Sequence, residues 1–272
     1  MKDDFIFKFI KENNFFASKK LGQNFLISNS IKKRIVDNAE ITINDFVLEI
    51  GPGFGALTEY IYLKTKKITL IEYDKRLYLY LKNKYPDIEI INNDILKVDL
   101  IEILKSKKYE KFIVISNLPY SVSSQIIFNL LKIKIIDYMI IMVQKEMADR
   151  LFASVGSKKY NGFSVIINLL TNVEKLFDVS SVNFYPAPKV NSTVLKIKPI
   201  KNIKFNVDEL TRFLKICFSS KRKQLINNLK KYYDEEKIKL CFKKIDLNIN
   251  IRPEKIEPKK FIEMMQVLNC DN

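Results

Sequence analysis

The sequence Val47-Leu48-Glu49-Ile50-Gly51-Pro52-Gly53-Phe54-Gly55 joins a short apolar run to three closely spaced glycines. The run predicts a buried strand, and the helical pattern from Ala56 onward predicts that the glycines form a strand-to-helix turn. Backbone N–H groups at such a turn can bind a ligand directly, because glycine accepts positive φ and has no Cβ. Gly51, Gly53 and Ala56 also satisfy the dinucleotide pattern G-x-G-x-x-G/A. By itself this segment indicates a ligand without identifying it.

Acidic residues end or follow the next two predicted strands, at residues 67–72 and 88–92. Glu72 lies 21 positions after Gly51, where α/β nucleotide-binding folds place the carboxylate that binds ribose hydroxyls. Asp94 follows the second of these strands, where a carboxylate can accept a hydrogen bond from an adenine amino group. Because open α/β sheets bind ligands at the carboxyl ends of their strands, this repeated placement predicts a nucleoside site.

The most specific signal is Asn117-Leu118-Pro119-Tyr120, which follows a predicted strand at residues 111–116. The exocyclic amine of adenine is a poor nucleophile, because its lone pair is delocalised into the ring. The Asn117 side-chain oxygen and the Leu118 carbonyl can both accept hydrogen bonds from that amine and make its lone pair available. Pro119 fixes the turn, and the Tyr120 ring can stack on the base. The motif therefore predicts methyl transfer to an adenine amino group without a strong general base.

Three cofactors are compatible with parts of this pattern. A nicotinamide dinucleotide accounts for the glycines and Glu72, but leaves Asp94 and the Asn117 motif unexplained. A P-loop nucleotide needs G-x-x-x-x-G-K-[ST], which is missing. S-adenosylmethionine accounts for all four features: the glycines contact its methionine part, Glu72 the ribose and Asp94 the adenine, while Asn117 lies beside the methyl group.

Composition excludes several other classes of protein. The chain has no histidine, so histidine acid–base catalysis and histidine-ligated metal are excluded. Its three cysteines are isolated and predict neither a zinc site nor a disulfide framework. No apolar run reaches the length of a membrane span, and the N-terminus has no signal-peptide layout. We therefore expect a cytoplasmic protein.

A second, helical domain is predicted after residue 200. The 272-residue chain has 47 Lys and Arg against 31 Asp and Glu, which indicates a polyanionic partner, although an AT-rich genome could supply part of the lysine surplus. Residues 201–272 hold 17 of these basic residues against 10 acidic ones. We expect domains at 1–200, with an N-terminal arm at 1–17, and at 201–272. The residues expected to contact RNA are Lys158, Lys159, Lys221, Arg222 and Lys223.

Two further segments carry expectations. The apolar run at residues 163–170 predicts a strand. Phe184, which is followed by two closely spaced prolines, is either the second face of a stacking slot with Tyr120 or a buried loop anchor.

Across about residues 18–229 the chain resembles the KsgA family of small-subunit rRNA adenine N6-dimethyltransferases. The resemblance rests on five motifs: Leu21-Gly22-Gln23-Asn24-Phe25-Leu26, residues 49–55, Asn117-Leu118-Pro119-Tyr120, Gln144-Lys145-Glu146, and Phe184-Tyr185-Pro186-Ala187-Pro188-Lys189-Val190. It implies a Rossmann-like, S-adenosylmethionine-dependent methyltransferase domain with a small all-helical C-terminal domain. It also implies that Asn24 and Leu26 cover the cofactor.

The implied reaction is dimethylation of N6 of two adjacent adenosines in the 3′-terminal hairpin of small-subunit (16S) rRNA, within a pre-ribosomal particle, by a monomeric enzyme. One alternative is the family that methylates large-subunit (23S) rRNA and gives macrolide resistance, which shares several of these motifs. A second is a ribosome-assembly factor that binds RNA without methylating it. Ser121 departs from the usual family pattern, in which an asparagine often follows the tyrosine, and this affects the pocket rim more than the chemistry.

Overall fold

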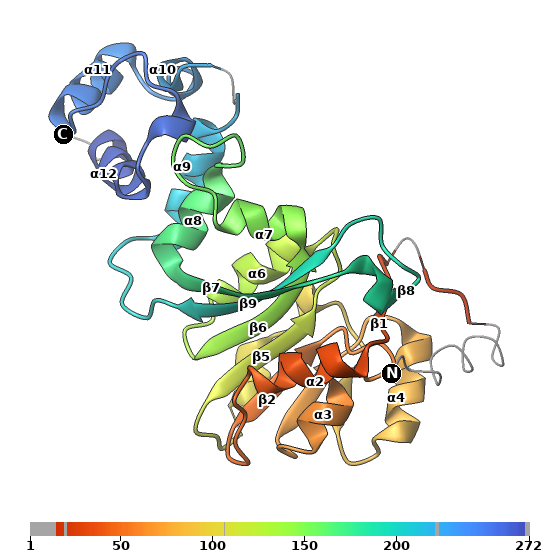
Figure 1. The fold of residues 1–272 in the computed structure, drawn as a ribbon. Helices are drawn as coiled ribbons and strands as arrows, with labels where there is room; N and C mark the ends of the chain where they lie inside the picture. Colours follow the sequence, from red (N-terminus) through yellow and green to blue (C-terminus); the bar gives the residue numbers. More distant parts are fainter. Residues whose placement is uncertain (1–14, 19–20, 106, 221–222, 270–272) are drawn as a thin grey trace. The chain divides into compact units, whose positions relative to one another are not determined.

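The computed structural model describes residues 15–18, 21–105, 107–220 and 223–269, which form two compact units (Figure 1). The first unit holds the described residues up to Ala148 together with Val173–Pro199. The second holds Asp149–Asn172 and the described residues from Ile200 onward.

The first unit is built around a seven-stranded sheet in the order β4-β3-β2-β5-β6-β9-β7. Its strands are β2 (Phe46–Ile50), β3 (Ile68–Ile71), β4 (Glu89–Ile91), β5 (Phe112–Asn117), β6 (Tyr138–Gln144), β7 (Thr171–Val179) and β9 (Ser192–Pro199). The strands from β4 to β6 in this order pair in parallel, and β9 pairs antiparallel with β6. The chain builds outward from β2 through β3 to β4 and then returns to the other side of β2 as β5. This reversal is the point at which open α/β sheets bind ligands.

Helices connect the strands of the sheet and pack against it. The helices of this unit are α2 (Asn29–Asp37), α3 (Thr58–Tyr62), α4 (Lys75–Lys84), α5 (Leu100–Leu104) and α6 (Ser123–Leu131), with short 3-10 helices η1 (Ile95–Lys97) and η2 (Ser181–Asn183). Helix α7 (Lys145–Leu151) begins in the first unit and ends in the second. Helices α2, α3 and α4 place apolar side chains in one cluster with alternate residues of β2, β5 and β6. Figure 1 shows α2 and α3 lying across one side of these strands. The predicted α/β class is confirmed.

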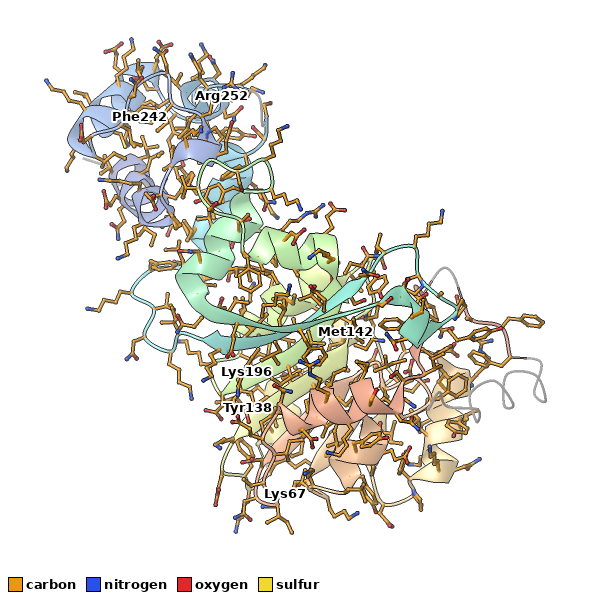
Figure 2. All side chains as sticks on the ribbon, in the orientation of Figure 1. Lys67, Tyr138, Met142, Lys196, Phe242 and Arg252 are labelled. Atoms are coloured by element: carbon orange, nitrogen blue, oxygen red, sulfur yellow. The ribbon has the colours of Figure 1, made fainter. Side chains whose placement is uncertain are left out.

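Two short strands and one buried lysine complete this unit. Strands β1 (Phe25–Leu26) and β8 (Phe184–Tyr185) form a two-stranded antiparallel pair with Leu26 opposite Phe184. On the main sheet, the Lys196 ammonium lies 4.8 Å from the centre of the Tyr138 ring, and both residues are labelled in Figure 2. The buried Lys196 ammonium thus has a cation–π contact with Tyr138 and an ion pair with Glu40 at 3.5 Å.

The second unit is helical. It contains α8 (Gly162–Leu170), α9 (Val207–Cys217), α10 (Leu225–Leu229), α11 (Glu235–Lys244), α12 (Pro258–Asn269) and the 3-10 helix η3 (Pro253–Lys255). Within it, α8 contacts α9 and α12. The strand predicted at residues 163–170 is wrong, because Asn161 caps this run as a helix through bonds to the N–H groups of Phe163 and Ser164.

The division of the chain also differs from the one expected at residues 200 and 201. Residues 149–172 pack with the C-terminal helices, because α8 supplies apolar side chains to their core. Among the described residues, none of the helices has both the length and the apolar character needed to cross a membrane.

Candidate active site

A cavity of about 270 Å³ lies in the first unit at the carboxyl ends of β2, β3 and β5. Its walls come from the glycine loop after β2, the ends of the neighbouring strands and residues 21–26. Ten of the predicted catalytic and cofactor-binding residues line it: Asn24, Leu26, Gly51, Gly53, Glu72, Asp94, Asn117, Leu118, Pro119 and Tyr120. Segments almost one hundred residues apart in the sequence are thus brought to one place.

The glycine loop leaves room for a ligand where the sequence requires it. Gly51 has φ +64°, and a Cβ built on it would meet no atom within 4 Å, so its bare backbone borders open space in the cavity. Gly53 has φ +62°, but a Cβ there would lie 3.2 Å from the Phe25 ring. The two glycines therefore serve different purposes: Gly51 borders the cavity, and Gly53 lets the 21–26 segment pack closely on the loop.

Glu72 is buried at the end of β3 and ties the glycine loop to that strand. Its two carboxylate oxygens accept hydrogen bonds from the N–H groups of Gly53 (3.0 Å) and Asp74 (2.8 Å). Burial raises the pKa of Glu72 to about 7, against the lowering effect of these hydrogen bonds. Each carboxylate oxygen has a second lone pair, so Glu72 can still accept from hydroxyl groups in the cavity.

Asn117 carries an unused acceptor. Its side-chain Nδ2 donates to the Asn24 carbonyl at 3.3 Å, which fixes the orientation of the amide. Its Oδ1 atom is buried and has no hydrogen-bond partner among the described residues. An unsatisfied buried acceptor is costly, and an amino group bound in the cavity would satisfy it.

The rest of the Asn117 motif is fixed by neighbouring strands. The Leu118 N–H donates to the carbonyl of Met142, which is labelled in Figure 2, at 3.1 Å. The Tyr120 hydroxyl lies 2.9 Å from the hydroxyl of buried Ser192 on β9. Burial raises the pKa of Tyr120, while the Ser192 hydrogen bond lowers it by less. The tyrosine is therefore a neutral, positioned ring at the cavity wall.

Phe184 does not line the cavity. Its ring is 2% exposed and belongs to the apolar cluster of the first unit, with its backbone opposite Leu26. This position is that of a buried anchor which holds β1 beside the cavity. A second stacking face at Phe184 stays a prediction.

The remaining cofactor residues, Asn24, Leu26 and Asp94, come from two separate segments that line the cavity. Asn24 donates from its side chain to the Gly22 carbonyl at 3.1 Å, while Leu26 is buried in β1. Asp94 caps η1 by accepting from the Leu96 N–H at 3.0 Å. No pattern in the residues themselves pointed to Asn24 and Leu26, and only the family resemblance indicated them.

Sequence reasoning gave Glu49 no role. It is 1% exposed, lines the cavity and accepts a hydrogen bond of 2.6 Å from the Thr58 hydroxyl. Burial raises its pKa to about 8. A lone acidic residue in an otherwise apolar strand is the signal that could have identified it, since a buried carboxyl needs a partner.

The predicted RNA-binding residues lie in the second unit or outside the described residues. Lys158 and Lys159 are exposed, and Lys159 forms an ion pair with Asp149 at 2.6 Å. Their loop is fastened to the C-terminal segment, because the Tyr160 hydroxyl donates to the Ile256 carbonyl at 2.9 Å. Lys223 is exposed, whereas Lys221 and Arg222 lie outside the described residues.

The residues present fit an adenosyl cofactor. The open space beside Gly51, the carboxylates of Glu72 and Asp94 and the free Oδ1 of Asn117 together offer a cradle and acceptors for hydroxyl and amino groups. In the part of the chain that the structure describes, no cluster of acidic and cysteine side chains could hold a metal ion.

Comparisons with known proteins match most of the chain. The family model described as "Ribosomal RNA adenine dimethylase" matches residues 14–269. A protein of Malacoplasma penetrans named "Ribosomal RNA small subunit methyltransferase A" is 50% identical over 94% of this chain and 93% of its own length. A protein of Borreliella burgdorferi with the same name is 35% identical over 96% and 92%, respectively.

Two solved structures have the same fold. A dimethyladenosine transferase from Plasmodium falciparum superposes with a TM-score of 0.75 at 26% identity, and the match covers 88% of this chain and 95% of that one. The 23S rRNA methyltransferase ErmE superposes with a TM-score of 0.65 at 22% identity over 91% and 100%. The second likeness is one of fold alone.

Proposed function

The chain belongs to the ribosomal RNA adenine dimethylase family, and we propose that it dimethylates N6 of two adjacent adenosines in the 3′-terminal hairpin of 16S rRNA. Membership of the family makes it an S-adenosylmethionine-dependent rRNA adenine dimethyltransferase. The relatives named as small-subunit enzymes support the choice of subunit. The single observation that carries the chemistry is the buried Oδ1 of Asn117 in the cavity wall, which has no hydrogen-bond partner within the described part of the chain.

The side chains around the cavity divide the work. When bound, S-adenosylmethionine supplies an electrophilic methyl group on its sulfonium and leaves as S-adenosylhomocysteine. Asn117 Oδ1 accepts a hydrogen bond from the adenine N6 amine, which favours a tetrahedral nitrogen with an available lone pair. The Leu118 carbonyl is the second acceptor, and the Tyr120 ring, held by Ser192, stacks on the base.

No strong general base is needed for this reaction. The nitrogen becomes cationic as the new N–C bond forms, and it then loses a proton readily to water. Repeating the reaction gives the dimethylated amine, so two adenosines require four transfers. Electrostatic positioning therefore accounts for the roles of Asn117 and Leu118.

The setting of the reaction is part of the same proposal. A surplus of 16 positive charges suits a partner made of RNA. Lys158, Lys159 and Lys223, with Lys221 and Arg222, would contact its phosphates. We propose that the protein acts as a monomer in the cytoplasm on a late, pre-ribosomal small subunit.

The test uses purified protein, labelled S-adenosylmethionine and unmethylated small subunits beside large subunits. We expect N6,N6-dimethyladenosine in the small-subunit RNA. Asn117→Ala should lower the rate of transfer by about 100-fold or more, because one preorganised hydrogen-bonding group of this kind contributes that much to catalysis. Asn38→Ala, which changes a partly buried asparagine outside the cavity, should leave the rate unchanged.

The alternatives predict different results. Label in the large-subunit RNA would assign the enzyme to the resistance methyltransferases, whose fold it shares. Cofactor binding without label in either RNA would favour a non-catalytic assembly factor. An Asn117→Ala variant as active as the unchanged protein would refute the role given to its Oδ1 atom.

A further inference from the structure

Residues 21–26 line the cavity but have little regular structure to hold them there. Only Phe25 and Leu26 belong to a strand, the two-residue β1. Gln23 and Asn24 precede that strand and form part of the wall. The N–H groups of Leu21 and Gln23 donate to the Ser18 carbonyl, and β1 pairs with β8. Side-chain contacts add to these backbone bonds.

Asp74 makes one polar contact with this wall, beside the bond from Asn117 to the Asn24 carbonyl. Its Oδ2 atom accepts a hydrogen bond of 2.8 Å from Gln23 Nε2, across 51 residues of sequence. The other end of the Gln23 amide accepts from the Ser18 N–H at 2.7 Å. Gln23 thus has both ends of its amide engaged, and its orientation is fixed.

Asp74 is itself held by more bonds than a helix cap requires. It is 6% exposed, and its Oδ1 atom accepts from the backbone N–H and Nε of Arg76, each at 3.0 Å. Arg76 Nη2 lies 2.6 Å from its Oδ2 atom. Burial raises the pKa of Asp74, but the hydrogen bonds from Arg76 and Gln23 outweigh this effect and leave the pKa below its ordinary value. The group is a carboxylate, which strengthens every bond that it accepts.

Arg76 extends the contact to an aromatic cluster. Its guanidinium lies 4.3 Å from the centre of the Phe15 ring, and its Nη1 atom donates to the Phe16 carbonyl at 3.4 Å. Phe15 packs against Phe54 of the glycine loop and against Phe25, with ring centres 5.1 and 6.0 Å apart. The Asp74–Arg76 pair therefore touches the N-terminal segment at two places, one polar and one aromatic.

The same pair is connected to the cofactor wall. Asp74 follows Glu72 by two residues, and its N–H donates to the Glu72 carboxylate at 2.8 Å. Glu72 in turn accepts from Gly53 on the glycine loop. One short chain of hydrogen bonds thus runs from the glycine loop through Glu72 and Asp74 to Gln23.

We propose that Asp74 and Gln23 are positioning residues that fix the 21–26 segment over the cofactor cavity and slow the release of the bound adenosyl ligand. This inference rests on the proposed function, because it takes the ligand to be S-adenosylmethionine or its product. Neither side chain transfers the methyl group. Their effect is on the residence time of the ligand, through Asn24 and Leu26, which are next to Gln23 in the chain.

The test measures the dissociation rate and Kd of S-adenosylhomocysteine with the full-length protein, by stopped-flow displacement and calorimetry. Gln23→Ala and Asp74→Asn should each speed dissociation about tenfold, the value of one hydrogen bond to a buried charged group. The double variant should dissociate little faster than either single variant, because both changes remove the same contact. In methylation assays the KM for S-adenosylmethionine should rise while kcat stays within about twofold.

A matched pair of variants distinguishes a positioning role of Asp74 from a purely structural role as a helix cap. Asparagine caps helices as well as aspartate does, so Asp74→Asn keeps the cap of α4 and alters its bonds to Gln23 and Arg76. Asp99→Asn makes the same change at the cap of α5, which does not line the cavity, and should leave dissociation unchanged. Gln23 caps no helix, so its variant tests the inference even if Asp74→Asn unfolds.

The results distinguish failure of the positioning role of Asp74 and Gln23 from failure of the proposed function. Unchanged dissociation in Gln23→Ala and Asp74→Asn, or equal acceleration in Asp99→Asn, would overturn this inference and leave the enzyme's function intact. Additive effects in the double variant would also overturn it, because the two side chains would then act separately. Failure of the unchanged protein to bind S-adenosylhomocysteine would instead contradict the proposed function.

Discussion

Two buried carboxyl groups, Glu49 and Glu72, line the cavity. Burial raises the pKa of Glu49 to about 8 and that of Glu72 to about 7. Each is held by hydrogen-bond donors, Thr58 for Glu49 and backbone N–H groups for Glu72. Burial disfavours the charged form of each carboxyl, and its proton therefore stays bound to a higher pH than in water.

These pKa values predict how stability changes with pH. Between the ordinary pKa of 4.5 and about 8, folded Glu49 keeps a proton that the unfolded chain releases. The cofactor-free protein should therefore lose stability as the pH rises through this window, and the loss should end above it. Glu72 acts in the same direction up to about pH 7.

Urea unfolding at a series of pH values checks this prediction. Glu49→Gln should flatten the decline, because the amide does not titrate, whereas Glu174→Gln at an exposed site should leave it unchanged. A free energy of unfolding that rises between about pH 5 and pH 8 would show that the unfolded chain binds more protons than the folded protein there, which would contradict the raised pKa of Glu49.

The site residues that could be predicted from the sequence are those whose position at the end of a strand is visible in the local pattern. Gly51, Glu72 and Asp94 follow strands and Asn117 ends one, and parallel strands bring such positions to one edge of the sheet. The contact between Gln23 and Asp74 joins residues 51 positions apart, and no sequence spacing predicts it. The same holds for the hydroxyl of Ser192, which reaches Tyr120 from a distant strand.

At the scale of secondary structure, the parallel strands were the most predictable elements. Strands buried on both faces are continuous apolar runs between turns, as in β2, β5 and β6. The run at residues 163–170 has the same composition, yet it forms α8. A short apolar run does not distinguish strand from helix, and here the capping box of Asn161 and Ser164 favours the helix.

This cap gives a second stability prediction. Asn161→Ala removes the side-chain acceptor for the N–H groups of Phe163 and Ser164. It should lower the free energy of unfolding by about 1 kcal/mol, the usual value of a helix N-cap. Asn202→Ala, at an exposed position after β9, should change it by less than about 0.5 kcal/mol. If Asn161→Ala and Asn202→Ala lowered the free energy of unfolding equally in urea, Asn161 would not act as a stabilising cap.

At the scale of the whole molecule, the net positive charge predicts that RNA binding depends on salt concentration. The surplus of 16 positive charges is spread over the chain, but part of it is neutralised locally, as in the Lys159–Asp149 pair. Counterions released from RNA phosphates make such binding weaken as salt increases. Lysines without an acidic neighbour should contribute most to this dependence.

The corresponding prediction concerns the salt dependence of RNA binding. A plot of log Kd against log salt concentration should be steep for unmethylated small-subunit rRNA, and Lys158→Ala should reduce its slope by about one. Asp149→Asn should strengthen binding at low salt, because it frees Lys159. A slope that neither variant changes would place the phosphate contacts elsewhere on the protein.

The path of the chain through its two units has a consequence for dissecting the protein. Each unit is assembled from two separate stretches, since Asp149–Asn172 joins the residues after Pro199 while Val173–Pro199 returns to the sheet. A truncated protein that stops at residue 199 would keep α8 but lose α9 and α12, leaving its apolar side exposed. Separating the two units therefore requires excision of both stretches of the second unit, with Ala148 joined to Val173, because no single cut yields two complete cores.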